Sequence, residues 1–549
     1  MSLEVDRGYY QVFSLIPRFL QVMSKVGVHW FRYGLRLHDN APLRKAISSC
    51  STLIPLYIID TDYFTPSSCG INRMGFLLDS LKALDEDLRE KGSKLFVATG
   101  NPCEVLRAII QQNKVEILTF ERDTEPYNRA MDESVFSMAA SLKIDVSALW
   151  GHTMFDPEYL LSLNNGTAPL TMTSFLKLMY VTGHPPKPLD APDKVTPPPE
   201  GPLGCEGVHL FPNPPSLEDL NKFNFKQEDK STWFVAGEKE AMQVMEKFFA
   251  QKRRTANFEK PKTSPTALEP DTTALSPYMS RGSLSSRLFY HRLKDTVKDF
   301  KNASKPPVSL QGQLYWREMA YLIGFSTPNF NQMKGNPICK QIPWQTGPEA
   351  KVLLEKWEAG QTGFPAVDAV MNQLKTEGWM HHLARHLVAC FLTRGDLWVS
   401  WEMGRDVFDK HLVDADWSIN NFSWHWLSCS AFFHQYFRCY SPIAFFKKTD
   451  PNGAYIKKHV PILSKFPAKY IYEPWTAPKA TQEACGCVIG KDYPKPMVDH
   501  STVNKINMGK MKNAYDAAKP LGGKKRATDG KDSPAKRKQS TLSNFSKKK

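Results

Sequence analysis

The first part of the chain alternates short apolar runs with longer segments in which apolar residues recur every three or four positions. The apolar runs have the length of strands and lie at 26–31, 53–60, 94–100, 114–120 and 144–150. The segments between them, such as 74–92, have the period of an amphipathic helix. This β-α-β repetition predicts a doubly wound parallel sheet (α/β) over residues 26–150. No G-x-G-x-x-G follows the first run, which argues against an ordinary dinucleotide site in this domain.

Proline interrupts the pattern after this domain, with 11 prolines among the 31 residues 185–215. Proline lacks a backbone N–H and breaks helices, so we expect residues 151–235 to be a long inter-domain connector. Helical periods with many aromatic residues follow and predict an all-helical domain over 236–500. Residues 1–25 are an N-terminal extension, and residues 501–549, poor in apolar residues, are predicted to be a disordered tail.

Positive charge is concentrated in that tail. Residues 501–549 hold 14 lysine and arginine residues against 3 acidic ones and so carry +11 of the net +15. The rest of the chain is nearly neutral, so charge indicates a nucleic-acid partner only at the tail. No apolar run approaches the roughly 20 residues of a membrane span, and we expect no membrane partner.

Charged residues within strongly apolar sequence mark a first candidate site. Arg385, Asp414 and Asp416 are of this kind, and burying such groups unpaired is costly. We therefore expect them to pair or to bind something polar. A second candidate lies at a predicted helix start, where hydroxyls and free backbone N–H groups suit a pyrophosphate, although an ordinary Ser/Thr cap is the alternative. Its residues are Thr272, Thr273, Leu275 and Ser276.

A histidine pair is the third candidate. His382 and His386 are four residues apart, so on a helix they share one face and can act on one ligand. With an ordinary pKa near ~6.5, a histidine supplies protons at neutral pH; a purely structural role is the alternative. Zinc is disfavoured, because the segment lacks the glutamate of H-E-x-x-H and a third ligand, and Cys485 with Cys487 lacks zinc-site spacing. We expect no metal.

Five long blocks of sequence bear on the function. They are HWFRYGLRLHDN from His29, LSPYMSRGSLSSRLF from Leu275, W-R-E from Trp316, GWMHHLARHLVACFLTRGDLWVSWE from Gly378 and DADWSINNFSWHWLSCSAFFHQYFRCYSPIAF from Asp414. In these blocks the chain resembles the photolyase/cryptochrome family over roughly residues 28–500, and within it the branch of (6-4) photolyases and animal-type cryptochromes. The resemblance implies an α/β domain followed by a helical domain that binds FAD.

The resemblance also implies roles around the flavin. Arg385 and Asp414 would form an ion pair beside the flavin ring, and Asn420 would face its N5 atom, where an amide can donate or accept. The FAD contacts that it implies are Thr272, Thr273, Leu275, Ser276, Gln313, His382, Arg385, Asp414, Asp416 and Asn420. The resemblance also raises an antenna chromophore, a folate or a deazaflavin, in the α/β domain; its presence in this chain and its identity are left open.

A chain of tryptophans is a further implication of the resemblance. Trp424, Trp401 and Trp344 match tryptophans that carry electrons between the flavin and the surface of the protein. Trp398 would be a fourth member, and because it lies three residues before Trp401 we expect the two on one helical face. Simple packing is the alternative for buried tryptophans.

The substrate that the resemblance implies is UV-damaged DNA. Gln313, Trp316 and Pro442 match residues that line the pocket for a flipped base, and base flipping is what photolyases do to reach a lesion. His382 and His386 match the pair that protonates a (6-4) lesion. We therefore expect a (6-4) DNA photolyase, a lyase. The alternative is an animal-type cryptochrome, acting as blue-light receptor or circadian transcriptional regulator, alone or beside repair.

Several residues depart from the family pattern, among them Tyr33, Ser280, Arg281 and two phenylalanines. Phe422 and Phe446 stand where the family has glycine. Because glycine accepts backbone conformations that phenylalanine resists, we expect the local backbone to differ at both positions.

Two motifs lie in the basic tail. KKR at 524–526 and KRK at 536–538 have the spacing of a bipartite nuclear import signal, which predicts an import receptor as partner and a location in the nucleus. The segment QSTLSNF, from Gln539 to Phe545, resembles a sliding-clamp-binding motif with Ser546 in place of its second aromatic residue. A basic end that only raises non-specific DNA affinity is the alternative. We expect the protein to be a monomer.

Overall fold

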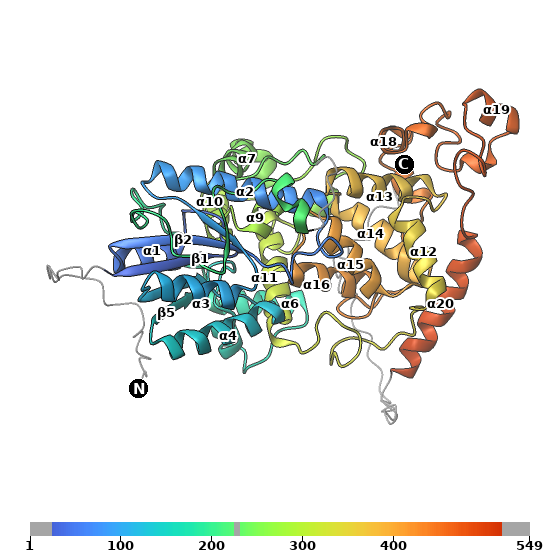
Figure 1. Cartoon of the computed structure of the whole chain (residues 1–549). Coiled ribbons are helices and arrows are strands. Elements are labelled where there is room, and N and C mark those ends of the chain that lie inside the picture. The colour runs from blue at the N-terminus through green and yellow to red at the C-terminus, as the bar shows by residue number, and fades with distance from the viewer. Residues whose placement is uncertain (1–24, 224–230, 519–549) are drawn as a thin grey trace, which may run out of the picture.

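The computed structural model describes residues 25–223 and 231–518 (Figure 1). An α/β unit built around a sheet lies beside a helical unit, the first drawn mainly in blue and the second mainly in yellow to red. None of the helices in these two ranges is both long and apolar enough to cross a membrane.

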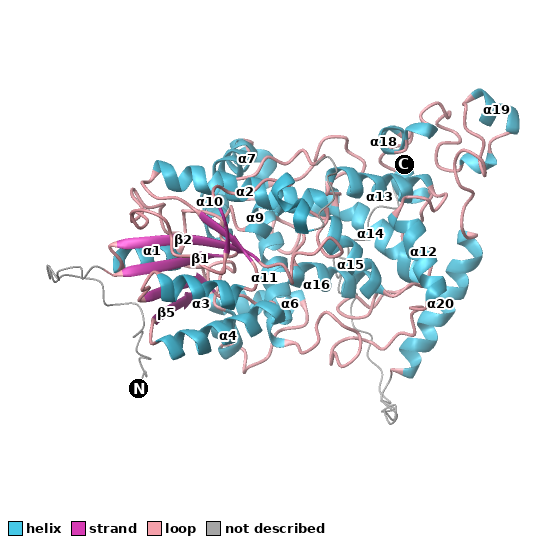
Figure 2. Ribbon diagram, in the orientation of Figure 1, coloured by secondary structure: helices cyan, strands magenta, loops and turns pink. Residues whose placement is uncertain are grey.

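The sheet, whose strands are drawn in magenta in Figure 2, has six strands in the order β5-β4-β1-β2-β3-β6. They are β1 Val26–Phe31, β2 Thr52–Ile59, β3 Phe96–Thr99, β4 Ile117–Glu121, β5 Asp145–Leu149 and β6 His209–Phe211. The first five run parallel and coincide with the apolar runs, because a sheet covered on both faces is apolar along its central strands. The predicted parallel sheet is confirmed.

Helices cover both faces of this sheet. They are α1 Ala41–Ser49, α2 Ile71–Glu90, α3 Pro102–Gln112 and α4 Pro126–Leu142. Leu43 of α1 and Leu81 of α2 pack in one hydrophobic cluster with Phe31 of β1. Ile109 of α3 and Val135 of α4 belong to a second cluster. Two helices therefore pack on one face and two on the other, which is the doubly wound arrangement.

The predicted connector takes part in both units. Its helices α5 (Pro157–Ser162) and α6 (Met172–Thr182) place Leu160 and Phe175 in a hydrophobic cluster of the helical unit. The proline-rich stretch follows, and the chain then returns to the sheet, where β6 pairs antiparallel with β3. Because β6 is only three residues long, no apolar run predicted it.

The helical unit contains the α-helices of residues 238–517. They are α7 Glu238–Ala250, α8 Lys252–Ala256, α9 Ser276–Arg281, α10 Ser286–Val297, α11 Leu310–Ser326, α12 Pro348–Glu358, α13 Pro365–Glu377, α14 His382–Cys390, α15 Trp401–His411, α16 Trp417–Leu427, α17 Ala444–Lys447, α18 Ala454–His459, α19 Lys479–Ala484 and α20 His500–Ala517. α11 packs against α16, and α13 against α18. This unit confirms the predicted all-helical domain.

α20 extends the helical unit beyond its predicted end at residue 500. The carboxylate of Asp499 accepts a hydrogen bond from the first turn of the helix, and Asn507 and Met511 are buried against the unit. A helix that buries so few of its side chains shows no apolar period, and this is why the expectation of disorder from residue 501 was wrong for this segment. The rest of the predicted tail, 519–549, lies outside the described residues.

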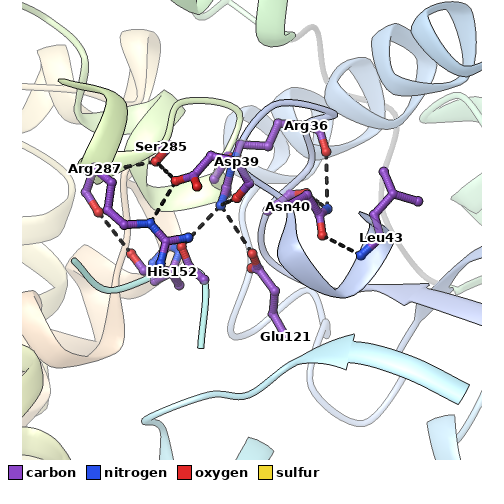
Figure 3. A network of polar contacts seen from close by, with 12 residues as sticks. Arg36, Asp39, Asn40, Leu43, Glu121, His152, Ser285 and Arg287 are labelled. Atoms are coloured by element: carbon purple, nitrogen blue, oxygen red, sulfur yellow. Dashed lines mark hydrogen bonds and ion pairs between the residues drawn. The ribbon is translucent and has the colours of Figure 1, made fainter. Parts of the chain in front are cut away.

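A network of polar side chains joins the two units (Figure 3). Arg36, which follows β1, forms an ion pair with Glu121 at the end of β4 (Nη2 to Oε1, 3.2 Å). Asp39 accepts hydrogen bonds from the hydroxyl of Ser285 and from Nε of Arg287 (2.9 Å), both at the start of α10. Burial alone would raise the pKa of Asp39, but the charges of Arg287 and Arg36 outweigh it and lower the pKa. The carboxyl ends of β1 and β4 therefore face the helical unit.

Candidate functional site

Arg385 and Asp414 form an ion pair inside the helical unit. Nη2 of Arg385, on α14, lies 2.8 Å from Oδ2 of Asp414, which precedes α16. The side chain of Asp414 is 4% exposed, and its other oxygen, Oδ1, is buried with no hydrogen-bond partner in the described part of the chain. The structure thus brings together the pair expected from the sequence and leaves one carboxylate oxygen for a polar ligand.

The two histidines lie one turn apart on α14. The rings of His382 and His386 meet edge to face with centroids 5.8 Å apart, so they share one helical face. Nδ1 of His386 is hydrogen-bonded to the hydroxyl of Tyr440 (3.0 Å). Nδ1 of His382 is buried and has no partner within the residues that the structure describes. His382 is therefore the member whose ring nitrogen is free for a ligand.

The protonation state of this pair differs from expectation. Burial, together with the positive charges of Lys260 and Arg385, lowers the pKa of His386 to about 3 and that of His382 well below 6.5. The protein groups alone therefore keep both imidazoles neutral at pH 7. The expectation that an ordinary pKa makes them proton donors at neutral pH was wrong. A negative charge placed beside them would raise both pKa values again.

Three more residues belong to this cluster, and the sequence patterns missed them. Lys260 lies near Arg385, and burial together with that positive charge lowers the pKa of Lys260 to about 8. His381 caps α14, because its Nδ1 accepts a hydrogen bond from the N–H of Leu383 (3.1 Å). Tyr440 comes from the loop after α16. His381 was detectable as the neighbour of a candidate residue, whereas Lys260 and Tyr440 are brought in only by folding.

Asp416 and Asn420 make other contacts. The carboxylate of Asp416 caps α16 and lies against the hydroxyl of Tyr321 and the ring of His152, so it faces the junction with the α/β unit. The amide nitrogen of Asn420 donates to Oδ1 of Asp409 on α15 (2.7 Å). The structure therefore engages the carboxylate of Asp416 with Tyr321 and His152, and the amide nitrogen of Asn420 with Asp409.

The hydroxyl-rich segment before α9 does not form an ordinary cap. Leu275 is the N-cap residue, and no side chain accepts a hydrogen bond from the start of this helix. The hydroxyl of Thr272 accepts instead from the N–H of Ala274 (3.4 Å), and Thr273 and Ser276 are at least partly exposed. The capping alternative is thus wrong, and the hydroxyls and first N–H groups of α9 remain available to a pyrophosphate.

The residues expected to line a base pocket come from α11 and from the loop after α16. Gln313 and Trp316 are one turn apart on α11, and Nε2 of Gln313 donates to the carbonyl of Pro307 (3.2 Å). Trp316 is partly exposed and meets Trp426 edge to face (centroids 5.4 Å apart). Pro442 is buried. Gln313 and Trp316 therefore present an amide and an aromatic ring from neighbouring turns of one helix.

Phe422 packs into an aromatic cluster beside Trp316. Its ring stacks on that of Phe432 (centroids 4.4 Å apart) and lies 6.0 Å from that of Trp316. Phe422 lies within α16 and Phe446 within α17, and neither has a positive φ. The expected change of backbone was wrong, because neither position needs the freedom of glycine. Phe422 instead adds volume next to Trp316.

The four candidate electron-transfer tryptophans are all buried, with at most 7% of any residue exposed. The rings of Trp344 and Trp398 lie 4.6 Å apart. The indole N–H groups of Trp344, Trp401 and Trp424 are buried without a partner among the residues described, although a buried indole N–H generally finds one. Ring contacts rather than hydrogen bonds hold these three side chains.

Trp398 and Trp401 do not share a helical face, contrary to the prediction. α15 begins at Trp401, and the hydroxyl of Ser400 caps it by accepting from the N–H of Glu402. Trp398 precedes the helix with a φ of +60°. Its carbonyl instead accepts a hydrogen bond from the N–H of Gln345 (3.0 Å). This pairing of two extended segments, not helical spacing, places Trp398 beside its neighbour Trp344.

Two segments of the chain match known families. Residues 27–193 match the family described as DNA photolyase, and residues 309–513 match the FAD binding domain of DNA photolyase. The helical unit is therefore a FAD-binding domain, which confirms the cofactor expected from the sequence.

The residues present fit this cofactor. Oδ1 of Asp414 and Nδ1 of His382 are buried polar atoms without protein partners among the described residues, and such an atom costs about 1–3 kcal/mol when left unsatisfied. The cations of Lys260 and Arg385 favour an anionic ligand beside them. A polar, negatively charged group such as FAD would satisfy both requirements.

Similar proteins include both repair enzymes and cryptochromes. The (6-4)DNA photolyase of Arabidopsis thaliana is 48% identical over 509 residues, which cover 90% of this chain and 89% of that protein. Cryptochrome-1 of Erithacus rubecula is 46% identical over 500 residues, 90% of this chain and 79% of that protein. The crystal structure of a bacterial class III photolyase from Agrobacterium tumefaciens has a TM-score of 0.76 at 26% identity and covers 90% of this chain and 98% of its own. With this fold, this FAD-binding domain and these relatives, the chain belongs to the DNA photolyase/cryptochrome family.

Proposed function

We propose that this protein is a (6-4) DNA photolyase, a lyase that uses light and FAD to reverse pyrimidine(6-4)pyrimidone photoproducts in UV-damaged DNA. The observation that carries the proposal is the histidine pair of α14, one member free and the other held by Tyr440, beside the ion pair of Arg385. Packing alone does not require two facing imidazoles next to two cations. A lesion that must gain and lose a proton during repair does require such a pair of imidazoles. The relative named (6-4)DNA photolyase supports the same reading.

The chain's own residues would bind the cofactor and the lesion. When bound, FAD supplies light absorption and the electron that starts the repair. Arg385, paired with Asp414, stabilises negative charge in the cavity. Trp316 stacks on a flipped base and Gln313 offers it an amide, since aromatic planes bind unstacked bases.

His382 would move the proton. The negative charges of the bound ligands raise its pKa, which burial and neighbouring cations otherwise hold low, so that the ring takes up a proton and can give it to the lesion. His386, fixed by Tyr440, assists. The oxygen substituent of the lesion would then return to its original base and the proton would return to His382, so the residues of the protein would end as they began.

The tryptophans would carry electrons to the buried cofactor from outside. Trp424, Trp401 and Trp344 serve in that order from the cofactor outward, with Trp398 beside Trp344. Replacing Trp401 with phenylalanine is expected to slow flavin photoreduction without preventing repair by enzyme that was reduced beforehand. Loss of both would contradict the role.

The test of the function is light-dependent restoration of DNA that carries one defined (6-4) lesion, run beside DNA with a cyclobutane dimer. We expect restoration of the first only. His382→Ala should abolish restoration while FAD remains bound, whereas His291→Ala, on α10 outside the site, should leave both unchanged. Repair by the His382→Ala variant would disprove the assigned proton donor.

The second candidate is an animal-type cryptochrome, a blue-light receptor or circadian transcriptional regulator. The 46% identity to a Cryptochrome-1 favours it. If flavin-loaded protein photoreduces its flavin but restores neither lesion, the result would support the cryptochrome function instead of the photolyase function.

We also propose that the tail directs the protein to the nucleus and engages a sliding clamp. Changing the basic residues of 524–526 and 536–538 to alanine should leave a fluorescent fusion in the cytoplasm. Changing Leu542 and Phe545 to alanine should abolish capture on purified sliding clamp without altering flavin content. Sedimentation of the full chain is expected to give a monomer.

A further inference from the structure

A groove of about 830 Å³ lies between the loop of residues 337–343 and the second half of α20. Figure 1 shows α20 on the outer side of the helical unit, far from the sheet. The lining is largely apolar, with Ile338 and Ala514 on opposite sides. Among the described residues it contains two lysines, Lys340 and Lys510, but no acidic side chain. The groove is therefore an apolar trough with positive charge.

α20 is fixed in place beside this groove. His500 at its first turn forms an ion pair with the buried Asp396 (Nδ1 to Oδ1, 2.6 Å). Near its end, the hydroxyl of Tyr515 donates to the carbonyl of Cys429 (2.7 Å). Because both ends of the helix are held by buried partners, the groove is part of the folded unit.

The groove is next to the outer tryptophan pair. Pro343, one of its lining residues, accepts a hydrogen bond from Nε1 of Trp398 (2.9 Å). Nζ of Lys510, another lining residue, lies 4.9 Å from the centroid of the Trp398 ring, and the ring of Trp344 follows at 4.6 Å. Only a lining residue therefore separates a molecule in the groove from Trp398 and Trp344, the pair at which the proposed electron path ends.

The positive charges of the groove favour an anionic ligand. Nζ of Lys340 lies 5.0 Å from the ring centroid of Tyr515, and neither Lys340 nor Lys510 forms an ion pair within residues 25–223 and 231–518. Two unpaired ammonium groups without a carboxylate between them attract anions. The chain's own residues 519–549, which follow the lining residue Ala518 in the sequence, contain 11 basic residues against 2 acidic ones, so their charge has the wrong sign for a positively charged groove.

We propose that this groove binds a small anionic one-electron reductant of the enediolate class, to which ascorbate belongs. The proposal rests on the electron-transfer role proposed above, in which an electron moving inward leaves an oxidised indole at Trp398 or Trp344. The reductant gives one electron to that radical cation and restores the neutral ring. The reductant leaves as its own one-electron-oxidised radical. The positive charge of Lys510 beside Trp398 makes the oxidised indole harder to form and easier to reduce.

The experiment follows the decay of the tryptophan radical after a laser flash on the full, flavin-loaded chain at low salt. The measurement is made at neutral pH. Ascorbate is the anionic electron donor, and hydroquinone, which is uncharged at neutral pH, is the matched neutral donor. We expect the decay rate to saturate with ascorbate. In the double variant Lys340→Glu/Lys510→Glu the decay rate of the tryptophan radical should fall roughly tenfold with ascorbate and stay unchanged with hydroquinone. The control Lys505→Glu/Lys512→Glu, which changes the same charge on α20 outside the groove, should behave as wild type.

Binding in the dark gives a second readout. Saturation-transfer NMR should detect ascorbate on the wild-type chain and on the control, but not on the groove variant. Equal ascorbate rates in all three proteins would overturn the proposal. So would ascorbate binding that appears only after residues 519–549 are removed, because the tail would then occupy the groove.

Failure of the repair function is separable from failure of this inference. A protein that restores no lesion but shows saturable, lysine-dependent decay with ascorbate keeps the groove assignment. An unchanged decay rate in the Trp398→Phe variant would overturn the groove assignment, and so would a flash that forms no tryptophan radical. Lesion repair by pre-reduced enzyme is measured independently of both.

Discussion

Nδ1 of His386 and the hydroxyl of Tyr440 lie 3.0 Å apart, although 54 positions separate them in the chain. Arg394 holds the loop that makes this contact, because its guanidinium donates to the carbonyls of Tyr436 (2.6 Å) and Arg438 (2.9 Å). Burial raises the pKa of Tyr440 to about 12, so its hydroxyl keeps its proton at neutral pH. The loop after α16 therefore orients the second histidine of the site.

Replacing Tyr440 with phenylalanine removes this hydrogen bond alone. A bond between neutral groups contributes about 1 kcal/mol, so we expect the rate of lesion repair to fall about five- to tenfold with FAD content unchanged. Single-turnover repair and the flavin absorbance of the purified protein measure the two quantities. Tyr180→Phe, at a residue that is 90% exposed, is the control. A Tyr440→Phe enzyme with unchanged repair would show that His386 needs no orientation.

The ion pair of Arg385 and Asp414 should respond differently to single and double replacement. Asp414→Leu leaves a partly buried guanidinium unpaired, and breaking such a pair costs about 3–5 kcal/mol. Arg385→Met/Asp414→Leu removes both charges, so its free energy of unfolding in urea should lie closer to wild type than that of the single variant. Both proteins should lose FAD. A double variant less stable than Asp414→Leu would contradict the account.

His425 should make stability depend on pH. Burial lowers its pKa to about 4, although its hydrogen bond to the carbonyl of Phe330 raises it. Below pH 6.5 the unfolded chain binds a proton that the folded chain refuses, so the folded state loses stability as the pH falls from 6.5 to about 4, by up to about 1.4 kcal/mol per pH unit. The wild-type free energy of unfolding should therefore fall more steeply over this range than that of His425→Gln.

Buried carboxyls contribute with the opposite sign, which is why the difference between the two proteins is the quantity to measure. Burial raises the pKa of Asp409 to about 6, so its neutral form stabilises the fold at low pH and this contribution is lost as the pH rises through that value. It is present in both wild type and His425→Gln and cancels in the comparison. A difference that does not vary with pH would refute the role of His425.

Phe422 should contribute to stability through its volume. Phe422→Ala empties the space between Phe432 and Trp316, and such truncations of buried phenylalanine cost about 3–5 kcal/mol. Phe422→Leu should cost less than half of this. Thermal unfolding measures both, with Phe437→Ala, at a residue that is 65% exposed, as the control. Equal melting temperatures for wild type and Phe422→Ala would contradict the packing role.

The strands β1 to β4 could be predicted because nearly all of their residues are buried and their sequences are therefore largely apolar. β5, an edge strand without a buried residue, could be predicted because apolar residues recur along it. β6 could not, because three residues at a sheet edge carry no such pattern, and α20 could not, because the residues it buries are few. Both elements are defined by what they pair with. Local sequence does not contain that information.

The site divides in the same way. Arg385 and Asp414 were identified because charge in apolar sequence requires a partner, and the partner proved to be each other. Lys260 and Tyr440 were missed because a lone lysine or tyrosine looks like any surface residue until folding buries it. The pKa values of the histidines were mispredicted for the same reason, since the burial that lowers them most and the charge of Lys260 arise only on folding.

The return of the chain to the sheet at β6 has a consequence for the order of synthesis. When the ribosome has made residues 1–150, the sheet still lacks its last strand and β3 has an unpaired edge, the kind of edge that promotes association between chains. The strand that covers it follows α5 and α6, whose apolar side chains belong to a core not yet made. The sheet therefore cannot be completed before residue 211 has been made, and a fragment cut at residue 150 should aggregate where the full chain does not.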